Sequence, residues 1–363
     1  MALLGPNDLK QWGFPSYWDP TELEKARLAD GTTFDRIMAD LGPALVVANN
    51  LIMADPITAS LISTSTEMII EQEVGGTAGF QAHTEYGQPD SKREATTGWM
   101  IPLDAWDRGL GWTWDYLRKA RANQIDNNVS SVIRDLKNLW AQKVLARLFK
   151  STYTAVGSSG RSMPIADGGT ADSAFVPVPV PDRASAFAYT HTHLGNGAGI
   201  TQAILTAGVK HIWEHGYDAP YDLLIAQADI ASWVNTTNVT GYVARKDPLI
   251  SYGLTADAAN VDTSYIGVVE TVYGSVRVRA SARIPTKYWA VYKSYGPMDG
   301  RNPLVVRTGE YGTQAVLLKG EGIRQFPLEK AIIFTEFGIG VANRLSAFVA
   351  FNDAGAYTDP TIL

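Results

Sequence analysis

The chain has 363 residues, of which 45% are hydrophobic and 19% charged, the proportions of a globular protein that buries a core. Its formal net charge of −6 argues against a sequence-reading nucleic-acid binder, because such proteins present basic surfaces to the phosphates. The absence of cysteine excludes disulfides, cysteine-ligated zinc and thiol catalysis. We expect neither a signal peptide, since the N-terminus lacks a basic segment followed by an apolar core, nor a membrane span.

The first hundred residues predict an arm, helices and a ribbon. Residues 1–20 are rich in proline, glycine and aromatics and predict an extended arm. Short helices are expected near 21–29 and 33–47, and residues 54–65 are expected to be irregular. Residues 66–74 and 96–104 predict two strands joined by a Gly-rich polar stretch. Because a two-stranded ribbon is only marginally stable alone in water, this pattern indicates an assembly.

The strongest helical signal lies in residues 127–150. Apolar residues recur there at spacings of three and four, from Val129 through Leu136 and Trp140 to Phe149. They form one stripe along the predicted helix. Cations such as Arg134 lie on the other face, which we interpret as solvated rather than as a DNA contact.

The second half of the chain predicts a mixture of helices and strands. After a proline- and glycine-rich stretch at 151–181, a helix is expected over 201–215, ended by Gly216. Alternating or apolar runs from residue 221 onward predict strands and short helices. The runs after residue 304 predict one antiparallel sheet at the end of the chain.

Four of the five histidines lie close together in the sequence: His191, His193, His211 and His215. The segment HIWEH at 211–215 matches the H-x-x-E-H pattern of zinc-protease helices. In that interpretation His211 and His215 bind zinc, Glu214 is the general base, and His191 or His193 adds a ligand. In the alternative interpretation the histidines are structural, with His215 complementing the helix dipole and His211 packed on the apolar face.

The order of these elements resembles the major capsid proteins of tailed bacteriophages, which share the HK97-type fold. Three stretches carry the resemblance: FAYTHTHLGNGAGIT followed by IWEHGYD, then VRVRASARIPTKYWAVYKSYGPMDGRNPLVVRTGEYG, and finally FGIGVANRLSAFVAFNDAGAYTDP. Taken in order, they make the resemblance cover nearly the whole chain.

The resemblance implies an α+β fold of the HK97 type. It implies an N-terminal arm at 1–62, an E-loop hairpin at 63–105, a peripheral domain at 106–199 with a spine helix at about 128–150, an axial domain at 200–300, and a closing sheet and tail of the peripheral domain at 301–363. It also implies that the four histidines pack where the domains join. No catalytic residue, cofactor or metal is implied.

The implied function is structural. The chain would self-associate into hexamers and pentamers and build the icosahedral head around double-stranded phage DNA, with weak non-specific DNA contact. The implied contacts between subunits are the E-loop tip (Asp90, Lys92, Arg93 and Glu94) and the arm (Trp12, Phe14, Tyr17 and Trp18).

Some members of this fold also form a Lys–Asn isopeptide bond. Here Lys92 would be joined to Asn343 or Asn352, with Glu336 as the proton acceptor. The alternative is that Lys92 is simply an exposed charge at the loop tip.

The implied partners are portal and scaffolding proteins, with decoration proteins as further candidates and no membrane. The implied location is the virion, with the host cytoplasm during assembly. Residues 1–50 are short and interrupted by proline, so we expect a separate scaffolding protein or a processed chain. Two alternatives remain: the shell of an encapsulin-like bacterial nanocompartment, and a zinc hydrolase using His211, Glu214 and His215.

Overall fold

The computed structural model describes residues 28–31, 34–74, 95–113, 119–156, 160–168, 192–245, 264–318, 328–353 and 355–362, with the single positions 116, 180 and 183. The chain divides into two compact units. The first comprises residues 1–53, 104–140 and 308–337, and the second comprises 54–103, 141–307 and 338–363. Both units therefore draw on separate stretches of the chain.

The first unit is built around the long strand β15 (Leu328–Val341), whose residues up to Phe337 belong to it. β4 (Asp104–Thr113) pairs antiparallel with β15, and β14 (Val316–Leu318) does the same on the other side. Buried and half-buried residues alternate along β15 from Ala331 to Phe337. This alternation is typical of a sheet with one face toward a core.

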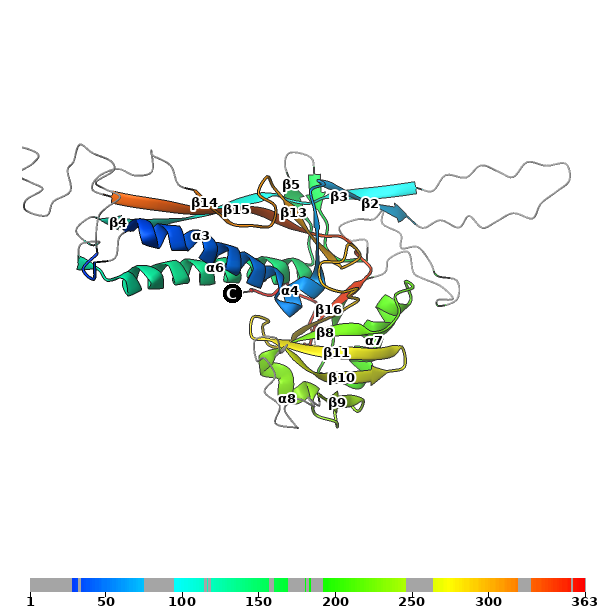
Figure 1. Cartoon of the computed structure of the whole chain (residues 1–363). Helices are drawn as coiled ribbons and strands as arrows, with labels where there is room; N and C mark the ends of the chain where they lie inside the picture. The colour runs from blue at the N-terminus through cyan, green and yellow to red at the C-terminus, as the bar shows by residue number, and fades with distance from the viewer. Residues whose placement is uncertain are drawn as a thin grey trace, which may run out of the picture. The chain divides into compact units, whose positions relative to one another are not determined.

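Two helices, α3 (Phe34–Met53) and α6 (Ala122–Leu148), the second as far as Trp140, run along this sheet in the first unit (Figure 1). Their buried residues recur at helical spacing: Leu41, Leu45, Ala48 and Ile52 in α3, and Ile125, Val129, Val132, Leu136 and Trp140 in α6. Trp140 stacks on Phe337 of β15, with ring centroids 3.9 Å apart. The helices expected near 33–47 and 128–150 are confirmed, although both are longer than expected toward one end.

The second unit contains a seven-stranded sheet in the order β7-β16-β12-β8-β11-β10-β9. The strands are β7 (Leu194–Asn196), β8 (Tyr221–Ala226), β9 (Tyr242–Ala244), β10 (Tyr265–Thr271), β11 (Gly274–Ser281), β12 (Tyr288–Tyr292) and β16 (Ala347–Phe351). β8 is parallel to β11, and β7 is parallel to β16. The other neighbouring strands are antiparallel.

One face of the seven-stranded sheet packs against α7 (Gln202–Trp213) and the short α8 (Ile230–Trp233), which follows a 3-10 turn at Gln227–Asp229. Every second residue of β8 faces this core: Tyr221, Leu223 and Ile225. Thr201 caps α7, because its side chain accepts a hydrogen bond from the backbone N–H of Ile204. The helix expected over 201–215 is thus confirmed, with an end at Trp213.

The second unit also holds shorter elements: α4 (Pro56–Leu61), β1 (Ile62–Ser65), β13 (Leu304–Thr308), and the paired strands β5 (Thr154–Val156) and β6 (Gly160–Ser162). β1 pairs with β13 in parallel. The expectation that residues 54–65 are irregular is therefore wrong. The Asp55 side chain accepts from the N–H of Thr58, and Pro56 stands in the first turn of α4, where its missing N–H costs nothing.

The ribbon expected from residues 66–74 and 96–104 is present. β2 (Ile69–Val74) pairs antiparallel with β3 (Ala95–Met100), with Ile70 opposite Trp99. The Trp99 indole N–H donates to the carbonyl of Val341 at 2.7 Å. Residues 75–94, between the two strands, lie outside the described part of the chain.

The expectation of one antiparallel sheet after residue 304 is wrong. β13 pairs in parallel with β1, and β16 lies between β7 and β12 in the seven-stranded sheet. Residues 347–350 are all buried, so this apolar run fits a position inside a sheet, and the run itself does not specify which strands flank it. Of the helices in the described ranges, none combines the length and apolar character that crossing a membrane requires.

Candidate functional site

Several predicted site residues lie outside the described part of the chain. They are the arm residues Trp12, Phe14, Tyr17 and Trp18, the loop-tip residues Asp90, Lys92, Arg93 and Glu94, and His191. Their roles stay predictions.

The other three histidines of the expected set come together in the second unit. His193 is fully buried, with Nδ1 at 2.8 Å from the carbonyl oxygen of Ala347 and Nε2 at 3.1 Å from Nε2 of His215. Because a carbonyl only accepts, Nδ1 of His193 carries a hydrogen. In the neutral ring Nε2 of His193 is then the acceptor, and His215 donates to it. His211 stacks on Phe348 with centroids 5.1 Å apart and lies 5.7 Å from the His193 ring.

The zinc interpretation requires His211 and His215 to share one helix face, with the Glu214 carboxylate available as a base. In the structure, the helix ends before Glu214, and this carboxylate pairs with Lys210 Nζ at 3.1 Å. His215 Nε2 is turned toward His193. Within the described ranges, no three His, Asp or Glu side chains are grouped so that they could hold a metal ion. The described residues therefore do not form the ligand set that the zinc-hydrolase alternative needs.

The two asparagines predicted for a cross-link already have side-chain partners in the second unit. Asn343 Nδ2 donates to the hydroxyl of Tyr217. Asn352 is 8% exposed, and its Oδ1 accepts from the indole N–H of Trp289 at 2.9 Å. Glu336, the predicted proton acceptor, belongs to the first unit. The bond from the loop-tip lysine to either asparagine stays a prediction.

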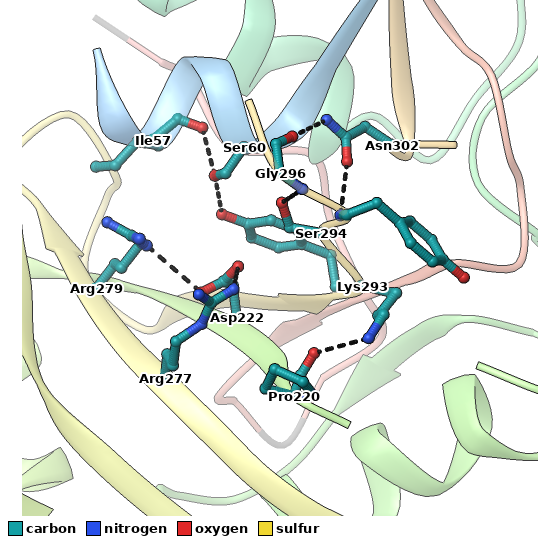
Figure 2. A network of polar contacts seen from close by, with 12 residues as sticks. Ile57, Ser60, Pro220, Asp222, Arg277, Arg279, Lys293, Ser294, Gly296 and Asn302 are labelled. Carbon is teal, nitrogen blue, oxygen red and sulfur yellow. Dashed lines mark hydrogen bonds and ion pairs between the residues drawn. The ribbon is translucent and has the colours of Figure 1, made fainter. Parts of the chain in front are cut away.

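A polar row on the second face of the seven-stranded sheet was not predicted from the sequence. Arg277, Asp222 and Tyr292 occupy paired positions on β11, β8 and β12. The Asp222 carboxylate is fully buried and accepts from Arg277 Nη2 at 2.7 Å and from Arg279 Nε at 3.4 Å (Figure 2). The Tyr292 hydroxyl lies 2.8 Å from Ser60 Oγ of α4. Side-chain hydrogen bonds thus join β11 to β8, through Arg277 and Asp222, and β12 to α4, through Tyr292 and Ser60.

Burial dominates the electrostatics of this row. Loss of hydration raises the pKa of Asp222, although the nearby charges of Arg277 and Arg279 favour its ionised form. Burial also raises the pKa of Tyr292, and the charge of Asp222 adds to that effect. Since the side chains of Asp222 and Tyr292 are both fully buried, neither can contact a substrate. Tyr292 holds α4 against the sheet, whereas Asp222 ties β8 to β11.

The sequence contained a partial signal for this row. Asp222 is the only charged residue in the run YDLLIA, and two arginines alternate with valines in VRVRA. Period-two alternation predicts that Arg277 and Arg279 share one face of a strand. It does not reveal the buried carboxylate on the neighbouring strand with which they pair.

Neighbouring exposed apolar side chains occur on α3 in the first unit and at the start of β2 in the second. In the first unit, Val46, Val47 and Leu51 of α3 are 54%, 57% and 53% exposed. In the second unit, Ile69 of β2 is 45% exposed, and Met68 just before it is 42% exposed. Contiguous exposed apolar residues are typical of contact surfaces.

Comparison with known proteins identifies the fold. No family model matches the chain, and no curated protein matches it. A solved structure from Mycobacterium phage Patience is 19% identical to it, with a TM-score of 0.66 over 93% of both chains. A structure of the mature capsid of bacteriophage PhiM1 is 12% identical, with a TM-score of 0.46 over 82% of this chain and 87% of that one. A structure of the SrpI encapsulin of Synechococcus elongatus is 10% identical, with a TM-score of 0.43 over 83% of this chain and 89% of that one. The chain therefore shares the mixed α+β fold of the structure from Mycobacterium phage Patience.

Proposed function

We propose that this chain is the major capsid protein of a tailed bacteriophage, a structural protein rather than an enzyme. The observation that carries the proposal is the shared fold with the Mycobacterium phage Patience structure along 93% of both chains. The exposed apolar residues of α3 and β2 support it, because an assembling chain removes such surfaces from water. The β2–β3 ribbon supports it as well, since two strands alone are marginally stable.

In this proposal, copies of the chain associate into hexamers and pentamers, and these rings enclose double-stranded DNA in an icosahedral head. A ring of identical copies uses two different surfaces of each chain, one toward each neighbour. The net charge of −6 suits an inner wall that contacts DNA weakly and without sequence preference. Portal and scaffolding proteins complete the assembly, and the virion is the final location.

The parts of the fold receive roles under the same proposal. The β2–β3 ribbon is the base of the E-loop at 63–105, and α6 is the spine helix of the peripheral domain. The seven-stranded sheet belongs to the axial domain, which then includes β7 and β16 in addition to residues 200–300. The histidine cluster is a packing element of the second unit.

Negative-stain electron microscopy and sedimentation velocity test the proposal. The untagged chain is expressed alone and together with its neighbouring genes, and we expect icosahedral particles or capsomer rings. Particles filled with a host enzyme rather than DNA would indicate the encapsulin-like alternative. Monomers under both conditions would overturn the shell proposal.

A pair of variants in α3 sharpens this test. Val47→Asp places a charge on the exposed apolar face and is expected to reduce assembly, because a buried unpaired carboxylate is costly. Asn50→Asp introduces the same charge at an exposed polar position of the same helix and is the matched control. If both variants assemble equally well, the exposed apolar face of α3 is not a contact surface between copies.

A further inference from the structure

One asparagine of the second unit is followed by a glycine, and such a pair is chemically reactive. Asn196–Gly197 is the only Asn-Gly pair in the 363 residues. The backbone nitrogen of the glycine can attack the side-chain carbonyl carbon of the asparagine, because glycine has no Cβ to hinder the approach. The bond from that carbon to the amide nitrogen breaks, ammonia leaves with the proton of the glycine N–H, and a succinimide ring forms. Water then opens the ring to aspartate or isoaspartate, so the asparagine is deamidated.

The structure holds the two reacting groups in place. Asn196 is the last residue of β7 and lies opposite Phe351 of β16 in a parallel ladder. The N–H of Gly197 donates to the carbonyl of Phe351 at 3.2 Å. Nδ2 of Asn196 donates to the carbonyl of Gly355 at 2.7 Å. The glycine nitrogen must therefore lose its bond to Phe351 before it can attack, and the asparagine side chain must turn away from Gly355 to meet it.

Burial does not protect this pair. Asn196 and Gly355 are both exposed, so water and hydroxide can reach the reacting groups. The protection comes instead from the two hydrogen bonds. The rate of deamidation then follows how often these bonds open, as for other reactions that require local unfolding.

Gly355 begins an irregular segment, residues 355–362, which we call the anchored segment. Side-chain hydroxyls fix it to the rest of the second unit. The hydroxyl of Tyr357 donates to the carbonyl of Phe149 at 2.6 Å. The hydroxyl of Tyr288, on β12, donates to the carbonyl of Thr358 at 2.9 Å. These anchors keep the start of the segment where it can accept the bond from β7.

We infer that Asn196 is a deamidation site controlled by the anchored segment: it stays intact while the segment is docked and is converted when the segment detaches. The conversion acts in one direction. An ionised aspartate only accepts hydrogen bonds, so it cannot bond the carbonyl of Gly355. Isoaspartate adds a methylene group to the backbone, which disturbs the register of β7 with β16. A copy that has been converted therefore cannot restore the original contact. This inference is independent of the proposed function.

The test measures deamidation of the purified full chain by trypsin digestion and mass spectrometry. Cleavage after Arg183 and Lys210 gives a peptide whose single asparagine is Asn196, and fragmentation assigns the change from amide to acid to that residue. The chain is incubated at mildly alkaline pH, folded or in guanidinium chloride. We expect the folded chain to deamidate about tenfold more slowly or less, because two hydrogen bonds must open first.

A pair of tyrosine variants tests the role of the anchored segment. Tyr357→Phe removes one anchor and keeps the ring, and we expect it to speed deamidation of the folded chain about fivefold, the factor for one lost hydrogen bond. Tyr242→Phe is the matched control. The hydroxyl of Tyr242 donates to the carbonyl of Ile266 at 3.0 Å, and β9 is the opposite edge of the same sheet from β7. We expect this variant to deamidate at the wild-type rate, and far-UV circular dichroism checks that both variants fold.

Two results would overturn the inference. Equal rates in the folded and the denatured chain would show that the hydrogen bonds of Asn196 and Gly197 give no protection. Equal rates in Tyr357→Phe and Tyr242→Phe would show that deamidation does not depend on detachment of the anchored segment.

Discussion

Gly208 lies inside α7, and replacing it with alanine tests how closely this helix packs on the seven-stranded sheet. In an exposed helix this change stabilises the protein by about 1 kcal/mol, because glycine loses more conformational entropy on folding. A Cβ at position 208 would lie 2.9 Å from Cδ1 of Phe348 and 3.1 Å from Cη2 of Trp289. Both rings are buried, and Phe348 also stacks on His211, so neither ring has room to move.

These distances decide the sign of the effect. Forcing an extra methyl group into a packed core costs about 1–3 kcal/mol, which exceeds the gain of about 1 kcal/mol in helix propensity. We therefore expect Gly208→Ala to lower the free energy of unfolding by about 1 kcal/mol. In urea denaturation of the unassembled protein, followed by tryptophan fluorescence, this corresponds to a midpoint about 0.3–0.5 M lower for a slope of roughly 2–3 kcal/mol/M.

The neighbouring residue supplies the control. Ala207 is exposed in the same helix, so Ala207→Gly changes helix propensity without touching the core and is expected to cost about 1 kcal/mol. If propensity alone decided the outcome, Gly208→Ala would raise the midpoint by as much as Ala207→Gly lowers it. That result would refute the argument from close packing.

Three further predictions concern stability. Trp140→Ala removes a fully buried ring that stacks on Phe337 of β15. We expect it to lower the free energy of unfolding, measured by urea denaturation, by about 3–5 kcal/mol, and Trp140→Phe to lower it less. Asp222→Ala leaves the Arg277 guanidinium without its buried carboxylate, so we expect the free energy of unfolding in urea to fall by about 3–5 kcal/mol. A change near zero would contradict the ion pair. Hydrogen bonds from Arg301 lower the pKa of Asp299 to about 2, so the stability that Asp299 contributes is present above pH 3.8 and lost as the pH falls toward 2. Asp299→Asn should reduce the acid sensitivity in that window, measured as melting temperature against pH.

Local patterns in the sequence were sufficient to predict the longer helices and the two-stranded ribbon. The apolar stripe that contains Val129 and Trp140 predicted α6, and Thr201 marked the start of α7. The strand-like runs at 66–74 and 96–104 predicted the ribbon of β2 and β3. Each of these signals is contained in a few turns or one strand, because helices and strands impose periods of 3.6 and 2 on neighbouring residues. The six residues of α4 are too few for such a period to stand out.

Contacts between distant residues were decided by the tertiary structure. Asp222 and Arg277 are separated by 55 positions, and their ion pair exists because β8 and β11 lie side by side in one register. The pattern H-x-x-E-H predicted that His211 and His215 share one helix face, but it did not reveal that both rings lie beside the ring of His193, 5.7 and 5.0 Å away. The sequence by itself determined which residues are apolar, where the longer helices and the ribbon strands form, and which fold the whole chain resembles. Strand order and register arise from packing among segments far apart in the chain, so the pairing of buried charges and histidines followed only from the folded structure.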